Sequence, residues 1–323
     1  MKREWTVMTK RERIETVMNG EEPDVVPAGF WFHYRPDYTV EQMIEAHMDL
    51  FRSTDMDVIK IMPDFPYALT GEIHSWEDWS NIAVKGTDCE EFGKMAAVIR
   101  GIRKEAGNDV MIFQTMFGPF KAASIQYTDP VLMRYSREYP EEVIKGVNRL
   151  AEGLAVWAKG FLDAGADGIY YSAQFSEPGR FSKEEWEKLV KPSDLYVLNA
   201  VKEQGGKTIL HICGEPEYQF RTNVAYFSDY PGDIVNWSVK DNGISLQEGY
   251  ELFHRPVLGG MNNKGNILTG PIRKIEEEAD QVISSFGTKG FMLGADCTIQ
   301  GKGISKVFIH AAVEAAHNYK LSH

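Results

Sequence analysis

Eight short apolar runs recur along the chain, and each is followed by a longer segment with apolar residues at helical spacing. The runs are 25–33, 57–63, 110–118, 168–175, 208–214, 233–239, 255–261 and 290–296. Runs that are apolar throughout are typical of strands buried on both faces, as in a parallel sheet covered by helices. Eight strand–helix units in about 300 residues favour a closed (β/α)8 TIM barrel over an open doubly wound sheet. We therefore predict an α/β barrel.

The chain shows no sign of division into domains. It has no linker, internal repeat or low-complexity stretch, so residues 1–323 are predicted to form one barrel domain. Thr9 followed by Glu12 is a capping-box pattern, which predicts an extra helix before the first strand. The first run continues as FWFHYRP and not as a glycine-rich phosphate turn, which disfavours a dinucleotide-binding fold.

Charge and cysteine content exclude several classes of function. The formal net charge of −12 disfavours nucleic acid as a partner, because an acidic surface repels phosphates. The first residues are charged and lack the apolar segment of a signal peptide, and no run of about 18 apolar residues occurs. Three widely separated cysteines do not make a disulfide framework. We expect a reduced, soluble, cytoplasmic protein with no membrane partner.

The active site of such a barrel lies where the strands end, at the carboxyl face. This criterion gives a short set of candidate residues: His33, Asp64, Gln114, Met116, Tyr171, Gln174, His211, Cys213, Asn236, Trp237, Met261, Asn262 and Cys297.

A histidine and two cysteines in this set form a candidate metal site. His211 and Cys213 are two residues apart on one predicted strand, so their side chains face the same way. Cys297 follows the last predicted strand. Side chains at the ends of the fifth and eighth strands can converge over the mouth of the barrel. One imidazole and two thiolates leave one position open on a tetrahedral zinc, as in catalytic sites. The alternative is that both cysteines are small buried apolar residues and His211 is a core histidine.

Four segments of the chain carry a resemblance to a known family. They are RERIETVMNGEEPDVVPAG at 11–29, VNWSVKDNGISLQEGYE at 235–251, RPVLGGMN at 255–262 and FMLGADCTIQGKGI at 291–304. In order and content they resemble the uroporphyrinogen decarboxylase superfamily over nearly the whole chain. The resemblance implies a (β/α)8 barrel, in agreement with the strand count.

Two branches of that superfamily differ at the site. The true decarboxylases carry an arginine-rich RQAGRY-like segment and a Gly-His-Gly turn, where this chain has FWFHYRPDY and GADCTIQ. The chain is more similar to the corrinoid-dependent methyltransferases, whose zinc is held by an H-x-C pair and a distant cysteine. That resemblance implies zinc ligands His211, Cys213 and Cys297. It also implies a corrinoid cofactor (methylcobalamin) carried by a small partner protein.

Further candidates have either a functional or a structural interpretation. Asp64 matches the position of a carboxylate that contacts substrate in the decarboxylases. The structural alternative is that Asp64 is an ordinary acidic residue in a loop. His33 is a candidate proton carrier or a packing residue. We assign both as candidate catalytic residues. The predicted substrate pocket consists of Tyr171, Gln174, Trp237 and Asn262.

The fourth zinc position is left open by the sequence. Related zinc methyltransferases often have a carboxylate ligand near the end of the sixth strand, where this chain has Asn236. Water, Asp241, Glu215 or substrate could then complete the site. Cys89 precedes a predicted helix, away from the strand ends, and is interpreted as structural.

Three hypotheses follow. The first is a zinc-dependent methyltransferase that moves a methyl group between a corrinoid protein and a small-molecule donor or acceptor. The second is a metal-independent decarboxylase of a tetrapyrrole or another poly-acid, and the third is a non-catalytic corrinoid or tetrapyrrole binder. The decarboxylase is disfavoured because no candidate at a strand end is an arginine. The nearest arginines, Arg35, Arg180 and Arg221, lie in predicted loops.

Overall fold

Eight parallel strands form one sheet in the computed structural model, which describes residues 7–64, 73–301 and 303–319. The strands are β1 (Ala28–Gly29), β2 (Val58–Ile61), β3 (Met111–Phe117), β4 (Gly168–Ala173), β5 (Lys207–Ile212), β6 (Ile234–Trp237), β7 (Val257–Met261) and β8 (Phe291–Ala295). Their order is β1-β8-β7-β6-β5-β4-β3-β2. Seven of the predicted apolar runs contain a whole strand, and the run 208–214 contains all of β5 except Lys207. The predicted TIM-like barrel is confirmed.

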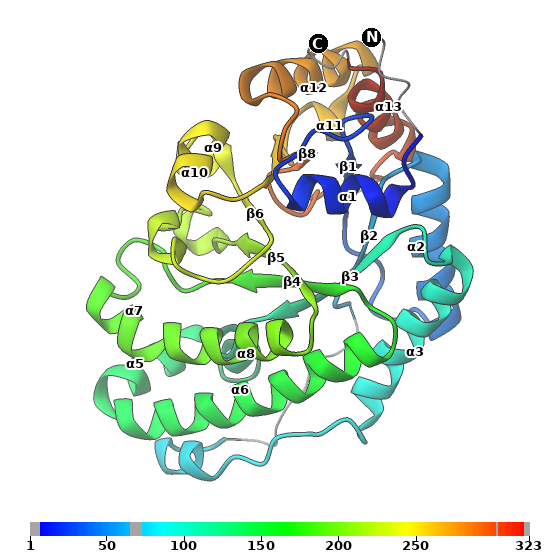
Figure 1. Ribbon diagram of the computed structural model, residues 1–323. Coiled ribbons are helices and arrows are strands. Elements are labelled where there is room, and N and C mark those ends of the chain that lie inside the picture. The colour runs from blue at the N-terminus through cyan, green and yellow to red at the C-terminus, as the bar shows by residue number, and fades with distance from the viewer. Residues whose placement is uncertain (1–6, 65–72, 302, 320–323) are drawn as a thin grey trace.

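Helices alternate with the strands and lie outside the barrel (Figure 1). The helices are α1 (Lys10–Met18), α2 (Val40–Thr54), α3 (Glu90–Ala106), α4 (Pro119–Tyr127), α5 (Asp129–Glu138), α6 (Pro140–Asp163), α7 (Lys183–Leu189), α8 (Lys191–Glu203), α9 (Val239–Asn242), α10 (Leu246–Phe253), α11 (Asn266–Thr269), α12 (Ile272–Phe286) and α13 (Lys306–Asn318). Thr9 and Glu12 form the predicted capping box, so α1 precedes the first strand as expected. None of the described helices is long and apolar enough to cross a membrane.

The junction between β1 and β2 depends on one buried carboxylate. The backbone N–H of Asp57 donates to the Ala28 oxygen over 2.9 Å, and its Oδ2 accepts the N–H of Ala28 over 2.8 Å. The same side chain pairs with Arg13 of α1 at 3.0 Å and with His317 of α13 at 2.8 Å. Asp57 therefore joins the first two strands to the two helices that lie over them.

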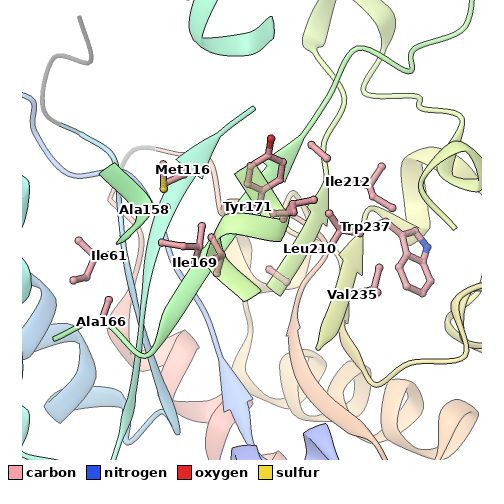
Figure 2. Close-up of a cluster of buried hydrophobic side chains, with 14 of the residues drawn as sticks. Ile61, Met116, Ala158, Ala166, Ile169, Tyr171, Leu210, Ile212, Val235 and Trp237 are labelled. Carbon is pink, nitrogen blue, oxygen red and sulfur yellow. The ribbon is translucent and has the colours of Figure 1, made fainter. Parts of the chain in front are cut away.

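Alternate residues of the strands point to different layers, as strand geometry requires. The barrel interior is filled by a separate apolar cluster that includes Val58, Met111, Phe113, Tyr170, Ile209, Ile234, Leu258 and Met292. The intervening residues pack outward with the helices, and several of them are labelled in Figure 2. Of two adjacent tyrosines on β4, Tyr170 thus lies inside the barrel and Tyr171 belongs to the outer layer.

The outer layer contains a buried carboxyl group, Asp194 of α8. It accepts hydrogen bonds from the Tyr171 hydroxyl over 2.7 Å and from the Tyr230 hydroxyl over 3.0 Å. Burial raises the pKa of Asp194 to about 7, although the two hydroxyls act in the opposite direction.

Replacement of Asp194 by asparagine should change how stability depends on pH. The pKa of this carboxyl is about 7 in the folded protein and near 3.8 when exposed. Between those values the folded state keeps a proton that the unfolded state has lost, so this group's contribution to the unfolding free energy falls as pH rises from about 4 to about 7. Urea denaturation at several pH values should show a smaller decline for Asp194→Asn than for the wild type. Asp163→Asn, at an exposed position on α6, should follow the wild type. Parallel curves for Asp194→Asn and the wild type would contradict the prediction.

Candidate metal centre

His211, Cys213 and Cys297 meet at the carboxyl face of the barrel. His211 lies near the end of β5, Cys213 follows that strand, and Cys297 comes shortly after β8. The two sulfur atoms are 3.9 Å apart, and the Cys297 Sγ lies 3.4 Å from the His211 Nε2. All three donor atoms lie within 4.8 Å of one another. The predicted convergence of these residues is confirmed.

Two of the three spacings between the donor atoms fit a tetrahedral zinc. Zinc–sulfur bonds of about 2.3 Å and zinc–nitrogen bonds of about 2.0 Å place sulfur atoms about 3.8 Å apart and sulfur and nitrogen about 3.5 Å apart. The observed separations of 3.9 Å and 3.4 Å are close to both values. His211 is buried and the two cysteines are partly exposed, so the group opens toward the mouth.

The hydrogen bond between the two cysteine side chains favours binding of a cation at this site. The hydrogen bond between the sulfur atoms lowers the pKa of Cys297 and raises the pKa of Cys213. One thiolate therefore forms readily, while a second one beside it is opposed by repulsion and burial. A divalent cation between the sulfur atoms removes that repulsion, because it stabilises both thiolates.

Asn236 on β6 fixes the tautomer of His211. The amide nitrogen of Asn236 donates to the Leu258 oxygen over 2.7 Å and to the Ala295 oxygen over 3.3 Å. Its Oδ1 therefore faces the other way, and it accepts from the His211 Nδ1 over 2.5 Å and from the Tyr170 hydroxyl over 2.9 Å. With its proton on Nδ1, the imidazole keeps a lone pair on Nε2, the atom that faces Cys297.

This arrangement gives Asn236 a different role from a carboxylate ligand. Its oxygen already accepts two hydrogen bonds, so it orients the histidine. Gly259 makes room for it, because a Cβ at that position would lie 3.1 Å from the Asn236 amide nitrogen. The glycine also has a φ of 146°, which side chains disfavour.

A cavity of about 10 Å³ adjoins the three donors. A space of that size holds about one water molecule, so it suits a single small fourth ligand. Asp241 lines the cavity, but its carboxylate contacts Lys264 at 2.8 Å and the Ser238 hydroxyl at 2.8 Å. Glu215 pairs with Lys121 at 2.6 Å. Both carboxylates predicted as possible fourth ligands are thus engaged with other groups.

The loop after Cys213 folds back over the cavity. A Cβ on Gly214 would lie 2.4 Å from the Phe220 oxygen, so only glycine permits this close approach. Gln219 and Phe220 both have left-handed backbone conformations, with φ of 56° and 58°. The ring of Phe220 then lines the cavity, with the Lys264 ammonium 3.6 Å from its centre.

The two candidate catalytic residues contact each other. Asp64 follows β2, and its carboxylate accepts the Tyr34 N–H over 2.8 Å and makes a short contact with the His33 Nδ1. The Asp64 side chain is 7% exposed and the His33 side chain is 56% exposed. The pair therefore links a buried carboxylate to solvent.

The four predicted pocket residues are not gathered together. Tyr171 lies in the outer layer, and the indole of Trp237 donates to the Ile244 oxygen over 3.0 Å on the α10 side of the sheet (Figure 2). Asn262 lines a separate groove beside α12. Gln174 follows β4 and is 5% exposed. Its Nε2 donates to the Ser172 hydroxyl over 3.3 Å, and its Oε1 lacks a hydrogen-bond partner among the described residues.

Two inward-facing residues were not among the candidates. Tyr170 precedes the tyrosine that the strand-end criterion selects, and Lys60 lies within the apolar run of β2. The sequence signal for Lys60 was a single charged residue in the four-residue strand VIKI.

A family model described as Uroporphyrinogen decarboxylase (URO-D) matches residues 56–319. The chain belongs to this family. No curated protein matches this URO-D chain in sequence.

Several solved structures share the fold of this URO-D chain at low sequence identity. A methyltransferase from Methanosarcina mazei has a TM-score of 0.75 at 17% identity, covering 96% of this chain and 98% of that one. A B12-independent methionine synthase from Shewanella sp. W3-18-1 has a TM-score of 0.61 at 11% identity, covering 90% and 94%. The GH5_18 protein from Streptomyces cattleya has a TM-score of 0.53 at 14% identity, covering 90% and 80%. At these identities the similarity establishes the fold.

Replacement of Asn236 by alanine should weaken metal binding while leaving all three donors in place. The imidazole loses the acceptor that fixes its tautomer, and loss of such a partner typically lowers metal affinity about 10- to 100-fold. Competition with a chelator measures the zinc affinity. Asn223→Ala is the matched control, because the Asn223 amide also donates to a carbonyl, that of Ser176, but away from the three donors. Equal zinc affinity in Asn236→Ala and the wild type would contradict this role.

Proposed function

We propose that this URO-D family protein is a zinc-dependent methyltransferase that moves a methyl group between a corrinoid protein and a small-molecule donor or acceptor. The observation that carries the proposal is the convergence of one imidazole and two thiols at the mouth of the barrel, with space for one further small ligand. Structural zinc sites use four protein ligands, whereas three ligands and an open position are typical of catalytic ones.

The chain's own residues would hold zinc and align the substrate. His211, Cys213 and Cys297 supply the ligands, and Asn236 keeps the imidazole in the ligating tautomer. Zinc in such a site acts as a Lewis acid that stabilises a deprotonated thiol or polarises an oxygen at neutral pH. Methyl transfer is a displacement, so the protein must mainly activate the heteroatom and orient it toward the methyl group.

Two further groups are assigned roles in this proposal. Gln174 lines the substrate pocket in this proposal. The residue before it, Ala173, accepts the Cys213 N–H over 2.9 Å, and the Gln174 Oε1 lacks a hydrogen-bond partner among the described residues. Asp64 and His33 carry protons between the pocket and solvent, since the buried carboxylate contacts the exposed imidazole.

The names of similar structures and the arginine pattern support a methyltransferase over a decarboxylase. The Methanosarcina mazei structure is named a methyltransferase and is similar over nearly the full length of both chains. A poly-acid substrate needs available arginines. Arg180 is buried in ion pairs with Glu177 and Asp129, and Arg35 pairs with Asp37 at 2.7 Å. Of the three arginines nearest to the strand ends in the sequence, Arg35 and Arg180 are thus already paired with carboxylates.

The corrinoid belongs to a partner protein in this proposal, and the chain contributes one catalytic domain, residues 1–323. The partial exposure of Cys213 and Cys297 would let such a partner bring its methyl group to the site. The protein is proposed to act in the cytoplasm.

Alanine at either metal-site cysteine should remove zinc and activity but leave the barrel folded. Each substitution deletes one of three protein ligands, and a site with two retains little affinity. Metal analysis of purified Cys213→Ala and Cys297→Ala measures the zinc content, and the methyl–cobalt absorbance of a methylated corrinoid protein follows transfer. Cys89→Ala is the matched control, because Cys89 lies at the start of α3 and should keep both zinc and activity. Full zinc content in both site variants would place the metal elsewhere and overturn the assignment.

The alternative activity gives an independent test. The purified protein should release no carbon dioxide from uroporphyrinogen under conditions in which an authentic decarboxylase turns over, because Arg35 and Arg180 are already paired with carboxylates. Decarboxylation is followed by product analysis with zinc-loaded and zinc-free protein. Decarboxylation by zinc-free protein would refute the methyltransferase proposal and support the decarboxylase hypothesis.

A further inference from the structure

Lys60 is a buried lysine in the middle of β2. It is 8% exposed, and it shares its strand face with Val58, which lies in the interior cluster of the barrel. No carboxylate in the described residues forms an ion pair with its ammonium group. A buried charge without an opposite partner is costly, and charged side chains are almost never found buried unpaired. Its presence therefore calls for an explanation.

The neighbours of the Lys60 ammonium are weak substitutes for a carboxylate. The Nζ lies 3.0 Å from the Met62 sulfur, 4.3 Å from the centre of the Tyr170 ring and 5.0 Å from that of the Trp31 ring. The faces of aromatic rings attract a cation but do not neutralise it. Burial lowers the pKa of Lys60 to about 7, and the negative charges of Cys297, Asp64 and Cys213 act against that shift.

Tyr170 connects this cation to the metal centre. One face of its ring receives the Lys60 ammonium, and the ring centre lies 5.3 Å from that of His211. Its hydroxyl donates to the same Asn236 oxygen that accepts from His211. The positive charge is therefore one aromatic ring away from the three donors, inside a barrel where its field is poorly screened.

We propose that Lys60 is a positioning residue whose buried positive charge favours an anionic ligand in the open position of the metal centre. This inference rests on the proposed function. A zinc ion with two thiolates is neutral, so a further anion gives the centre one negative charge, and Lys60 balances it. The substrate class that fits is a molecule whose S–H or O–H group loses its proton to solvent and binds through the resulting anion. A neutral ether or amine gains nothing from this charge.

The test uses protein loaded with cobalt(II) in place of zinc, because the visible spectrum of cobalt reports its ligands. The wild type, Lys60→Met and Lys60→Arg are titrated with 2-mercaptoethanol, which binds as its anion, and with imidazole, which binds neutral. Lys60→Met should bind the thiol more weakly by a factor on the order of ten. This is the size of the attraction expected between the ammonium group and a bound anion on the other side of the Tyr170 ring, in the low dielectric of the barrel interior. Lys60→Arg, which keeps the charge, should retain most of the thiol affinity, and imidazole should bind all three proteins alike.

A second measurement separates this role from a structural one. Removal of an unpaired buried charge should leave the melting temperature of Lys60→Met at or above that of the wild type, whereas loss of a packing residue would lower it. If Lys60→Met does not fold, Lys60→Gln, which is also uncharged, replaces it in the titration. Unchanged thiol affinity in a folded, cobalt-loaded, uncharged variant overturns the inference about Lys60 alone. Failure of the wild type to bind cobalt or zinc overturns the proposed function instead.

Discussion

The hydrogen bonds of one amide, that of Asn236, determine the geometry on which the centre depends. Its nitrogen donates to backbone oxygens of Leu258 on β7 and Ala295 on β8, and its oxygen accepts from Tyr170 on β4 and His211 on β5. One side chain on β6 thus connects five consecutive strands at the level of the metal site. Because all four hydrogen-bonding positions of the amide are used, its orientation is fixed, and the ligating nitrogen of the histidine is fixed with it.

The barrel interior combines an apolar cluster with polar groups near the carboxyl face, namely Lys60, Cys213 and Cys297. Burial of these polar groups is expected to lower the free energy of unfolding. Lys60 carries a charge among aromatic rings, and the second deprotonation of the Cys213 and Cys297 pair is opposed by burial. Such groups are tolerated because a large apolar core surrounds them. Function and stability therefore favour different residues at the same level of the barrel, a conflict that is common at catalytic sites.

The sequence predicted the strands and the metal group well because both depend on simple periodicities. Eight apolar runs fixed the number of strands, and the spacing of His211 and Cys213 placed both on one face. The pocket residues were harder, since a strand end does not say which side chains turn inward, and Tyr171 was selected in place of its inward neighbour Tyr170. Lys60 was missed because the two aromatic rings near its ammonium group, those of Trp31 and Tyr170, are distant from it in sequence, and only the folded barrel brings them together.

The alternation of inner and outer side chains has a consequence for how such a protein can evolve. Tyr170 and Tyr171 are identical and adjacent, yet one contacts the metal-site network and the other bonds to Asp194 beneath a helix. Odd and even positions of one strand thus belong to two separate sets of contacts, and substitutions in sets that share no partners are close to independent. Selection can alter the chemistry of the mouth through one set while the other preserves the scaffold, so a single barrel sequence can diverge in activity without first losing its fold.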